Sequence, residues 1–340
     1  VTRRIAHLIR SGIPDYRMLA LTFTYKAAGE MKERVEKLVG PCRALVSTFH
    51  SACARFLRMD IERLACGRDR RFTIYDDSEQ QSIIKTCLGN LNLDEKRYSP
   101  RSVQSSISRH KTEMVTPESA LAEAKGYQQE AHAKVYDAYE KALRQANAFD
   151  FDDLLWVTLR LWVASPELLA QYQNRYQYLL VDEYQDTNRT QYMMLRLLAG
   201  ERRNLHATGD PDQSIYSWRG ADYRNIMDFK NDYPGAKVVA LEQNYRSTQR
   251  ILNIANQLIR HNEHRLEKNL FTEGAEGETA RLLSLPDDRA ESGFLAAEIK
   301  KLKKQGRAYK DFAIFYRINA HSRGIEEVFM RVTIPYVIIG

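Results

Sequence analysis

The chain has 340 residues, of which 44% are hydrophobic and 28% charged, so it has the composition of a globular protein with room for two or three domains. No apolar stretch approaches the length of a membrane span, and the first residues lack the apolar core of a signal peptide, which predicts an intracellular protein without a membrane partner. Cys42, Cys53, Cys66 and Cys87 lie too far apart for a CxxC metal pair, so we expect reduced thiols.

The net charge of +7 is concentrated near the start of the chain. Residues 1–70 contain 14 Lys/Arg and 7 Asp/Glu, whereas residues 71–340 contain 37 of each. A basic surplus in one region favours a polyanionic partner such as nucleic acid, although a solubilising surface has the same composition.

The first 75 residues have the pattern of α/β units. An apolar run at 18–23 and a second at 44–48 predict buried strands, and periodic apolar residues predict helices over 26–38 and 50–59. Residues 76–173 then have helical periodicity with breaks at Pro100 and Pro117, which predicts an all-helical insertion.

Strand patterns return after the insertion. Three apolar runs, each followed by a polar loop and a helix, lie at 178–181, 205–208 and 237–241. We therefore expect the insertion to interrupt one parallel-sheet domain. A second α/β pattern begins after residue 274, with strands predicted at 280–284, 312–316 and 336–339 and helices at 290–304 and 322–332.

An acidic pair, Asp182 and Glu183, directly follows the predicted strand 178–181. At the carboxyl end of a parallel strand, one carboxylate can hold Mg²⁺ on nucleotide phosphates, and the next can orient or deprotonate the attacking water. The alternative is an acidic loop that caps a helix starting near Asn188.

The loop 209–220 (GDPDQSIYSWRG) carries more functional groups than a turn needs. Gln213 can contact a phosphate or a water, Trp218 can stack on a nucleobase, and Arg219 can bind a phosphate. The alternatives are a tight turn at Gly209 and Asp210, and a core position for Trp218. Asp150, Asp152 and Asp153 form either a metal cluster or, as we prefer, an N-cap with a solvated first turn.

These segments resemble conserved motifs of the superfamily 1 UvrD/Rep/PcrA DNA helicases. Residues 182–187 (DEYQDT) resemble motif II and residues 209–220 motif III. Further matches, in the family's order, lie at 22–28 (TFTYKAA), 48–51 (TFHS), 150–155 (DFDDLL), 243–247 (QNYRS) and 315–323 (FYRINAHSR). The resemblance implies an α/β fold in which a RecA-like parallel-sheet domain (1A) is interrupted by a helical insertion (1B) and followed by part of a second RecA-like domain (2A). The implied ranges are 1–75 and 176–260 for 1A, 76–175 for 1B and 261–340 for 2A.

The resemblance also implies roles for individual residues. Asp182 would bind Mg²⁺, Glu183 would be the general base, and Gln213 would sense the γ-phosphate of ATP. Arg246 would act as an arginine finger, unless it caps the helix that begins near Thr248, and Tyr245 would stack on the adenine. The implied DNA-contacting residues are Phe23, Thr48, His50, Tyr216, Trp218 and Arg219. Phe23 could instead be a core residue.

The implied activity is that of an ATP-dependent 3′–5′ DNA helicase or single-stranded DNA translocase. ATP and Mg²⁺ would be its cofactors, and single-stranded DNA and single/double-strand junctions its substrates. Repair or replication proteins would be its partners in the bacterial cytoplasm, at the nucleoid. The alternatives are a single-stranded-DNA-binding module without ATPase activity and the motor part of a helicase-nuclease.

The chain departs from the family pattern at several places. Tyr25 replaces the usual Asn, and Thr208 replaces an aliphatic residue. More importantly, no phosphate-binding loop of the form GxxxxGK[ST] occurs in the sequence. The expectation is a fragment that starts just after this loop, ends near the 2A/2B junction, and is inactive alone.

Overall fold

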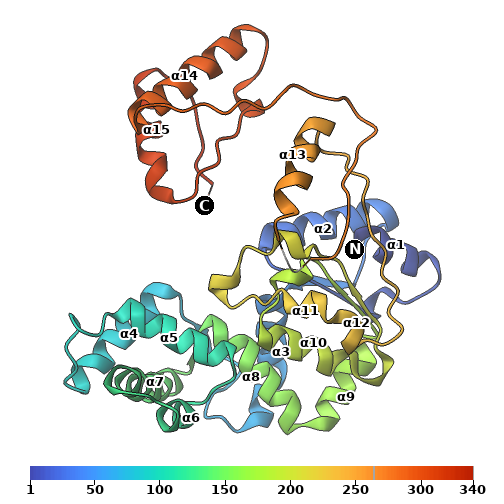
Figure 1. The fold of residues 1–340 in the computed structure, drawn as a ribbon. Helices are drawn as coiled ribbons and strands as arrows, with labels where there is room; N and C mark the ends of the chain where they lie inside the picture. Colours follow the sequence, from blue (N-terminus) through green and yellow to red (C-terminus); the bar gives the residue numbers. More distant parts are fainter. Residues whose placement is uncertain (263–264, 340) are drawn as a thin grey trace. The chain divides into compact units, whose positions relative to one another are not determined.

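The computed structural model describes residues 1–262 and 265–339, apart from the side chain of Arg219. The chain divides into two compact units, which we describe separately (Figure 1). The first contains Val1–Glu242 and Leu258–Asn269, and the second contains Gln243–Gln257 and Leu270–Gly340.

The first unit is built on a sheet of four parallel strands. Its order is β2 (Leu45–Thr48), β1 (Met18–Thr22), β5 (Tyr178–Val181) and β6 (Leu205–Ala207). Val181 lies level with Leu21 on one side and with Ala207 on the other, so the carboxyl ends of these strands meet at one edge of the sheet. The parallel sheet predicted from the sequence is confirmed, and each of these strands begins and ends within one residue of its predicted bounds.

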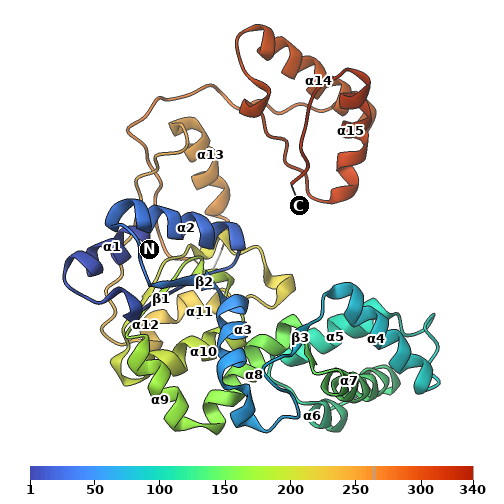
Figure 2. The ribbon, with the colours of Figure 1, turned by 180° about the vertical axis from the view of Figure 1, so that it is seen from behind.

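Alternating side chains of the strands bury the two faces of the sheet. Met18 and Ala20 pack with α1 (Thr2–Arg10) and α2 (Tyr25–Val39). Leu19 and Leu21 point to the other face, where four helices pack: α3 (Phe49–Asp60), α8 (Phe151–Ala164), α9 (Pro166–Arg175) and α10 (Arg189–Ala199). Figure 2 shows α1 and α2 on the side of the sheet opposite α9 and α10. Because both faces are covered, the two central strands, β1 and β5, are almost continuously apolar in sequence.

A second hydrophobic core lies among the helices of the predicted insertion. It is formed by α4 (Asp77–Asn90), α5 (Pro100–Thr112), α6 (Pro117–Ala122) and α7 (Tyr127–Gln145). The breaks predicted at Pro100 and Pro117 are present, and each proline occupies the first turn of the helix that follows the break. A short parallel pair, β3 (Thr73–Ile74) with β4 (Ala148–Phe149), was not predicted. Most of the buried side chains of α8 and α9 pack instead against the sheet, so the region 76–175 contributes to two cores.

Asp150 is the N-cap of α8, and Asp153 completes its capping box, which confirms the predicted cap. The expected solvation is wrong, because Asp150 and Asp153 are buried against the Lys111 ammonium, 2.7 and 2.8 Å from its Nζ. Within the described residues, no group of three His, Cys, Asp or Glu side chains could hold a metal ion. The Asp150 and Asp153 carboxylates therefore belong to a buried ion cluster.

The second unit contains α14 (Asp288–Lys304) and α15 (Ser322–Arg331), which confirm the helices predicted at 290–304 and 322–332. The two helices pack through Ile299 and Phe329. Most of α13 (Gln249–Ile259) also belongs to it. Two short helices of the first unit, α11 (Arg224–Met227) and α12 (Phe229–Asp232), precede them in the chain.

Four strand predictions are wrong. Residues 237–241 in the first unit, and 280–284, 312–316 and 336–339 in the second, have no strand structure. Several of their apolar side chains are exposed, including Phe315 at 94%. A strand forms only when a neighbouring strand pairs its backbone and its apolar side chains are covered. Among the described residues no strand pairs with these segments, and side chains such as Phe312 and Ile314 are only partly buried.

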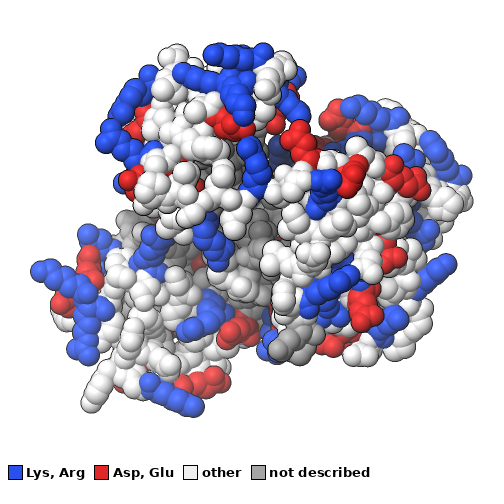
Figure 3. Space-filling model, turned by 45° about the horizontal axis from the view of Figure 1, so that its top comes forward, with Lys and Arg blue, Asp and Glu red and all other residues white. Residues whose placement is uncertain are grey.

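Among the described residues, every helix is too short or too polar to traverse a lipid bilayer. Lys and Arg side chains are spread over much of the face shown in Figure 3, with Asp and Glu among them.

Candidate nucleotide and DNA site

The acidic pair lies at the edge where the carboxyl ends of the strands meet. Asp182 directly follows β5, and its backbone N–H donates to the carbonyl of Leu21 in β1 at 3.0 Å. Glu183 has a φ of 54°, in the left-handed region that non-glycine residues rarely adopt. Such strain is common at active sites, where the surrounding structure holds a side chain in a required direction.

The Asp182 carboxylate is suited to bind a divalent cation. Burial disfavours the charged form of Asp182, and the adjacent Glu183 carboxylate disfavours a second negative charge beside it. Both effects raise the pKa of Asp182. A bound divalent cation would relieve this repulsion, and Mg²⁺ in nucleotide sites commonly uses only one or two protein carboxylates. The residues present therefore fit a magnesium ion held chiefly by the nucleotide phosphates.

Gln185 connects the acidic pair to the loop 209–220. This side chain is 1% exposed, and its Nε2 donates to Glu183 Oε2 at 2.8 Å. Its Oε1 accepts the backbone N–H of Asp210 at 2.9 Å. Gln185 lies inside the motif, but its role is not predictable from the sequence, because the partner of a glutamine is not visible there.

Gly209 permits this close approach. A Cβ at that position would lie 2.5 Å from Gln185 Oε1 and 3.1 Å from the backbone nitrogen of Tyr184. The sequence interpretation of Gly209 as a turn residue thus misses its main constraint, which is space for the acidic loop. The two loops are joined further by the Tyr184 N–H, which donates to the Thr208 carbonyl at 2.9 Å.

The start of the same loop is held by ion pairs. Asp210 accepts hydrogen bonds from Lys268 and from Gln213 Nε2, the latter at 2.8 Å. Burial opposes the charge of Asp210, but these contacts outweigh burial and hold its pKa below the usual value. Asp212 pairs with Arg265 at 3.2 Å. The predicted phosphate sensor Gln213 is therefore exposed but positioned by Asp210.

The alternative role of the acidic loop as a helix cap is not supported. Asn188 is the N-cap of α10, and its side chain accepts the Gln191 N–H at 2.9 Å. Asp186 instead faces Glu183, and burial together with the Glu183 charge raises the pKa of Asp186 to about 6. Asp182 and Glu183 are thus not needed to start the helix.

Trp218 is 72% exposed, which contradicts the alternative that it is a core aromatic. Its ring centroid lies 6.5 Å from that of Tyr216, with an interplanar angle of 49°. Two neighbouring aromatic rings at the surface suit base stacking. The side chain of Arg219, predicted to bind DNA, lies outside the described residues.

The other predicted DNA-contacting residues lie at the carboxyl ends of β1 and β2. Phe23 packs on Phe49 with ring centroids 5.5 Å apart, so it belongs partly to the core. Thr48 is buried as the N-cap of α3. His50 packs edge-on against Phe151, and burial lowers the pKa of His50 to about 4. His50 is therefore neutral at physiological pH.

Tyr245 and Arg246 belong to the second unit. Tyr245 is exposed and its hydroxyl donates to Gln243 Oε1 at 2.6 Å. The backbone N–H of Arg246 donates to Asn244 Oδ1 at 2.9 Å, three residues before α13 begins at Gln249. Glu183, in contrast, belongs to the first unit.

Two family models cover nearly the whole chain. Residues 1–234 match the UvrD/REP helicase N-terminal domain, and residues 239–340 match the UvrD-like helicase C-terminal domain. The chain is also 47% identical, over its entire length, to proteins named ATP-dependent DNA helicase PcrA from Staphylococcus aureus and Staphylococcus epidermidis. It spans about half the length of these relatives, 47%. From the motifs, the fold and these similarities, the chain belongs to the UvrD/Rep/PcrA family of superfamily 1 helicases.

Proposed function

We propose that this chain forms much of the motor of an ATP-driven DNA helicase or single-stranded DNA translocase that moves 3′ to 5′. The observation that carries the proposal is the Gln185 side chain, which joins the Glu183 carboxylate to the loop that bears the exposed Trp218. A protein that only bound DNA would need the stacking surface but no connection to an acidic pair. The similar staphylococcal proteins, named ATP-dependent DNA helicases, support the same activity.

In this mechanism each residue has a separate task. Asp182 holds Mg²⁺, which when bound neutralises charge on the ATP phosphates. Glu183 accepts the proton of the attacking water, and Gln213 contacts the γ-phosphate. By the family resemblance, Arg246 stabilises the charge that develops on the transferred phosphoryl group, and Tyr245 stacks on the adenine.

DNA controls hydrolysis through the loop 209–220. A base stacked on Trp218 would bias the position of this loop, and the Asp210 backbone would transmit the change to Gln185. Gln185 would in turn alter the direction of the Glu183 carboxylate. This chain of contacts gives a physical basis for ATP turnover that increases when DNA is bound.

The remaining assignments follow from the family. We propose that residues 1–75 and 176–260 form domain 1A, 76–175 form 1B and 261–340 begin 2A. Single-stranded DNA and its junctions with duplex are the proposed substrates. Repair or replication proteins are the proposed partners, and a cytoplasmic location at the bacterial nucleoid follows from the substrate.

The decisive experiment is Glu183→Gln in the full-length protein. Glutamine keeps the oxygen that accepts from Gln185 but is a far weaker base, so DNA-stimulated ATP turnover should fall by orders of magnitude while nucleotide binding persists. Steady-state phosphate release and nucleotide titration measure the two quantities. A threefold change in turnover corresponds to less than about 1 kcal/mol in the activation free energy. Turnover within about threefold of the parent would therefore show that Glu183 is not the general base. A parent that binds DNA without turnover would instead be a DNA-binding module.

A further inference from the structure

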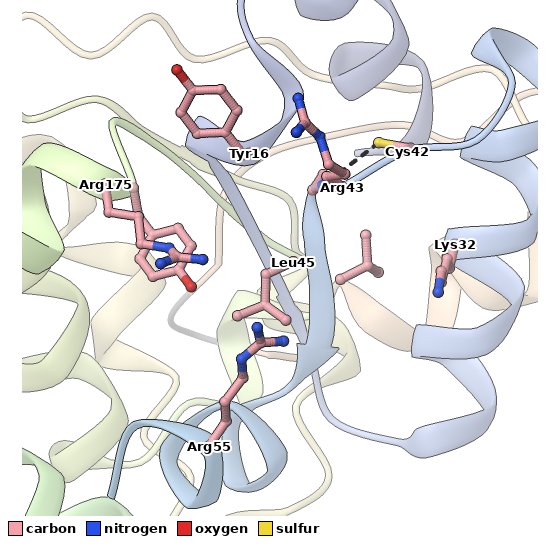
Figure 4. A pocket seen from close by; sticks show the side chains of 10 residues that line it. Tyr16, Lys32, Cys42, Arg43, Leu45, Arg55 and Arg175 are labelled. Carbon is pink, nitrogen blue, oxygen red and sulfur yellow. Dashed lines mark hydrogen bonds between the residues drawn. The ribbon is translucent and has the colours of Figure 1, made fainter. Parts of the chain in front are cut away.

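A group of four cationic side chains surrounds the outer edge of β2, away from the acidic pair. They border a cavity of about 240 Å³ (Figure 4). Its lining residues are Tyr16, Lys32, Cys42, Arg43, Ala44, Leu45, Val46, Arg55, Arg175 and Tyr176. Because β2 is an edge strand of the sheet, this cavity, which we call the β2-edge pocket, opens to the surface.

The cations reach the pocket from both faces of the sheet. Lys32 is on α2, which covers one face, whereas Arg55 on α3 and Arg175 at the end of α9 belong to helices on the other. Figure 4 shows the Arg55 and Arg175 side chains extending toward the space beside Leu45. Residues distant in sequence thus contribute like charges to one place.

Three of these four charges lack acidic partners. Among the residues that the structure describes, no ion pair involves Lys32, Arg55 or Arg175. Arg43 pairs with Asp15, at 3.5 Å between Nε and Oδ1. The pocket lining itself contains no carboxylate. Three neighbouring cations without ion-pair partners raise the local electrostatic potential, and a bound anion lowers it again.

The size of the pocket limits the ligand. Sites for whole small molecules usually measure about 300–1,000 Å³, so 240 Å³ suits a single anionic group of a larger molecule. Guanidinium groups bind phosphate with two parallel hydrogen bonds, and the pocket offers three of them. Three of its four cations also lie in residues 1–70, which carry the basic surplus of the chain. A phosphate of a nucleic-acid backbone meets all of these conditions.

The pocket is also within reach of the proposed DNA-binding residues. Leu45 lines the pocket and Thr48, the predicted DNA-contacting residue, ends the same strand. Three residues of strand span about 10 Å, a distance that about three phosphates of a stacked strand cover. We propose that the β2-edge pocket binds a backbone phosphate of single-stranded DNA that extends beyond the predicted DNA-contacting residues. This inference rests on the proposed DNA-handling function.

The test removes three charges from the pocket in the full-length protein, by Lys32→Gln, Arg55→Gln and Arg175→Gln together. The matched control, Arg34→Gln, Lys37→Gln and Lys141→Gln, removes three exposed cations that pair with acids one helical turn away. Anisotropy of labelled oligo(dT) over a KCl series gives the affinity and its salt dependence. Trp218→Ala, which removes a predicted DNA-stacking side chain outside the pocket, serves as a second comparison. Thermal melts check that each variant folds.

The pocket variant should bind oligo(dT) roughly tenfold more weakly at low salt than the control variant, as expected for loss of one charged contact. The slope of log affinity against log salt should fall by about 0.7, the value for one phosphate of a single strand. Restoring charge with Arg55→Lys and Arg175→Lys, in place of the two Gln substitutions, should recover most of the slope. Trp218→Ala should weaken binding without changing the slope, because indole is uncharged.

Equal slopes for the pocket and control variants, with Trp218→Ala still impaired, would overturn the pocket proposal and leave the proposed function intact. A carboxylate-bearing protein segment would then be the better ligand for the pocket. A parent protein that fails to bind oligo(dT) would instead overturn the proposed function itself.

Discussion

At the scale of single residues, the orientation of the Glu183 carboxylate depends on Gln185, which takes no part in the proposed proton transfer. Glu183 has a strained backbone, with φ of 54°, and its side chain is held by the buried Gln185 amide. Gln185 is in turn fixed by the backbone of Asp210. We infer that Gln185 is a positioning residue, whose loss should affect DNA stimulation more than DNA binding.

Gln185→Leu provides the test. The substitution leaves the partly buried Asp210 N–H without its acceptor, which costs about 1 kcal/mol of stability, and it releases Glu183. DNA-stimulated ATP turnover should fall at least tenfold while oligo(dT) affinity changes little. Gln173→Leu is the control, because Gln173 donates a comparable hydrogen bond to the Leu197 carbonyl far from the acidic loop. If both variants keep the same DNA stimulation, Gln185 has no positioning role.

The lowered pKa of His50 leads us to expect that the stability of the protein depends on pH. Burial lowers its pKa from 6.5 to about 4 in the folded protein, so the unfolded chain binds more protons between these values. The free energy of unfolding should therefore fall as pH decreases from about 6.5 to 4, by up to about 3 kcal/mol from this residue. Urea unfolding of the parent and His50→Gln across this range isolates the effect. Parallel curves for the two proteins would contradict it.

At the scale of secondary-structure elements, a buried ion cluster joins the helical insertion to the sheet domain. Lys111 on α5 contacts Asp150 and Asp153, at the start of α8, and Glu140 on α7. Burial opposes the charge of Lys111, but these three carboxylates outweigh burial and raise its pKa. A second buried cation, Arg68, lies 3.4 Å from Glu140 and 3.9 Å from Asp153. Because α8 packs against the sheet, the cluster links the two cores.

Lys111→Met should destabilise the protein by about 3–5 kcal/mol, because it leaves buried carboxylates without their closest cation. Adding Asp153→Leu should recover part of this loss, since one of the uncompensated charges is removed. Lys141→Met, which breaks an exposed pair with Asp137, should change stability by less than about 1 kcal/mol. Chemical denaturation measures all three. A loss for Lys111→Met as small as that for Lys141→Met would show that the cluster is not stabilising.

At the scale of the whole molecule, the two units carry different parts of the proposed chemistry. Asp182, Glu183 and Gln213 belong to the first unit, and Tyr245 and Arg246 to the second. Neither unit contains a GxxxxGK[ST] loop, which in related nucleotide sites supplies backbone N–H groups, a lysine and a Mg²⁺-binding hydroxyl. The carboxylates alone do not position the phosphates.

The 340-residue polypeptide by itself should therefore show no DNA-stimulated phosphate release above background. Its single-stranded DNA binding should be affected less, because Trp218 and the basic residues of 1–70 are present. Phosphate release and single-stranded DNA binding should be measured on the same protein preparation. Robust ATP turnover would show that the phosphates are held by groups other than the missing loop.

The sequence by itself determined the local elements and the chemistry of the motifs. The strands at 18–22 and 178–181 are predictable because a parallel strand covered on both faces must be apolar throughout. The acidic pair is predictable because its residue types follow such a strand directly. Pro100 and Pro117 similarly mark helix starts, since proline fits the first helical turn.

Only the tertiary structure decided which distant groups meet. Burial of the Asp150 and Asp153 carboxylates depends on Lys111, about 40 residues earlier in the chain, so a local pattern suggested solvation instead. The role of Gln185 depends on the backbone of Asp210, and the exposure of Trp218 depends on how its loop packs. The apolar runs at 312–316 and 336–339 are not strands, because pairing and burial are properties of the assembled fold rather than of the segment.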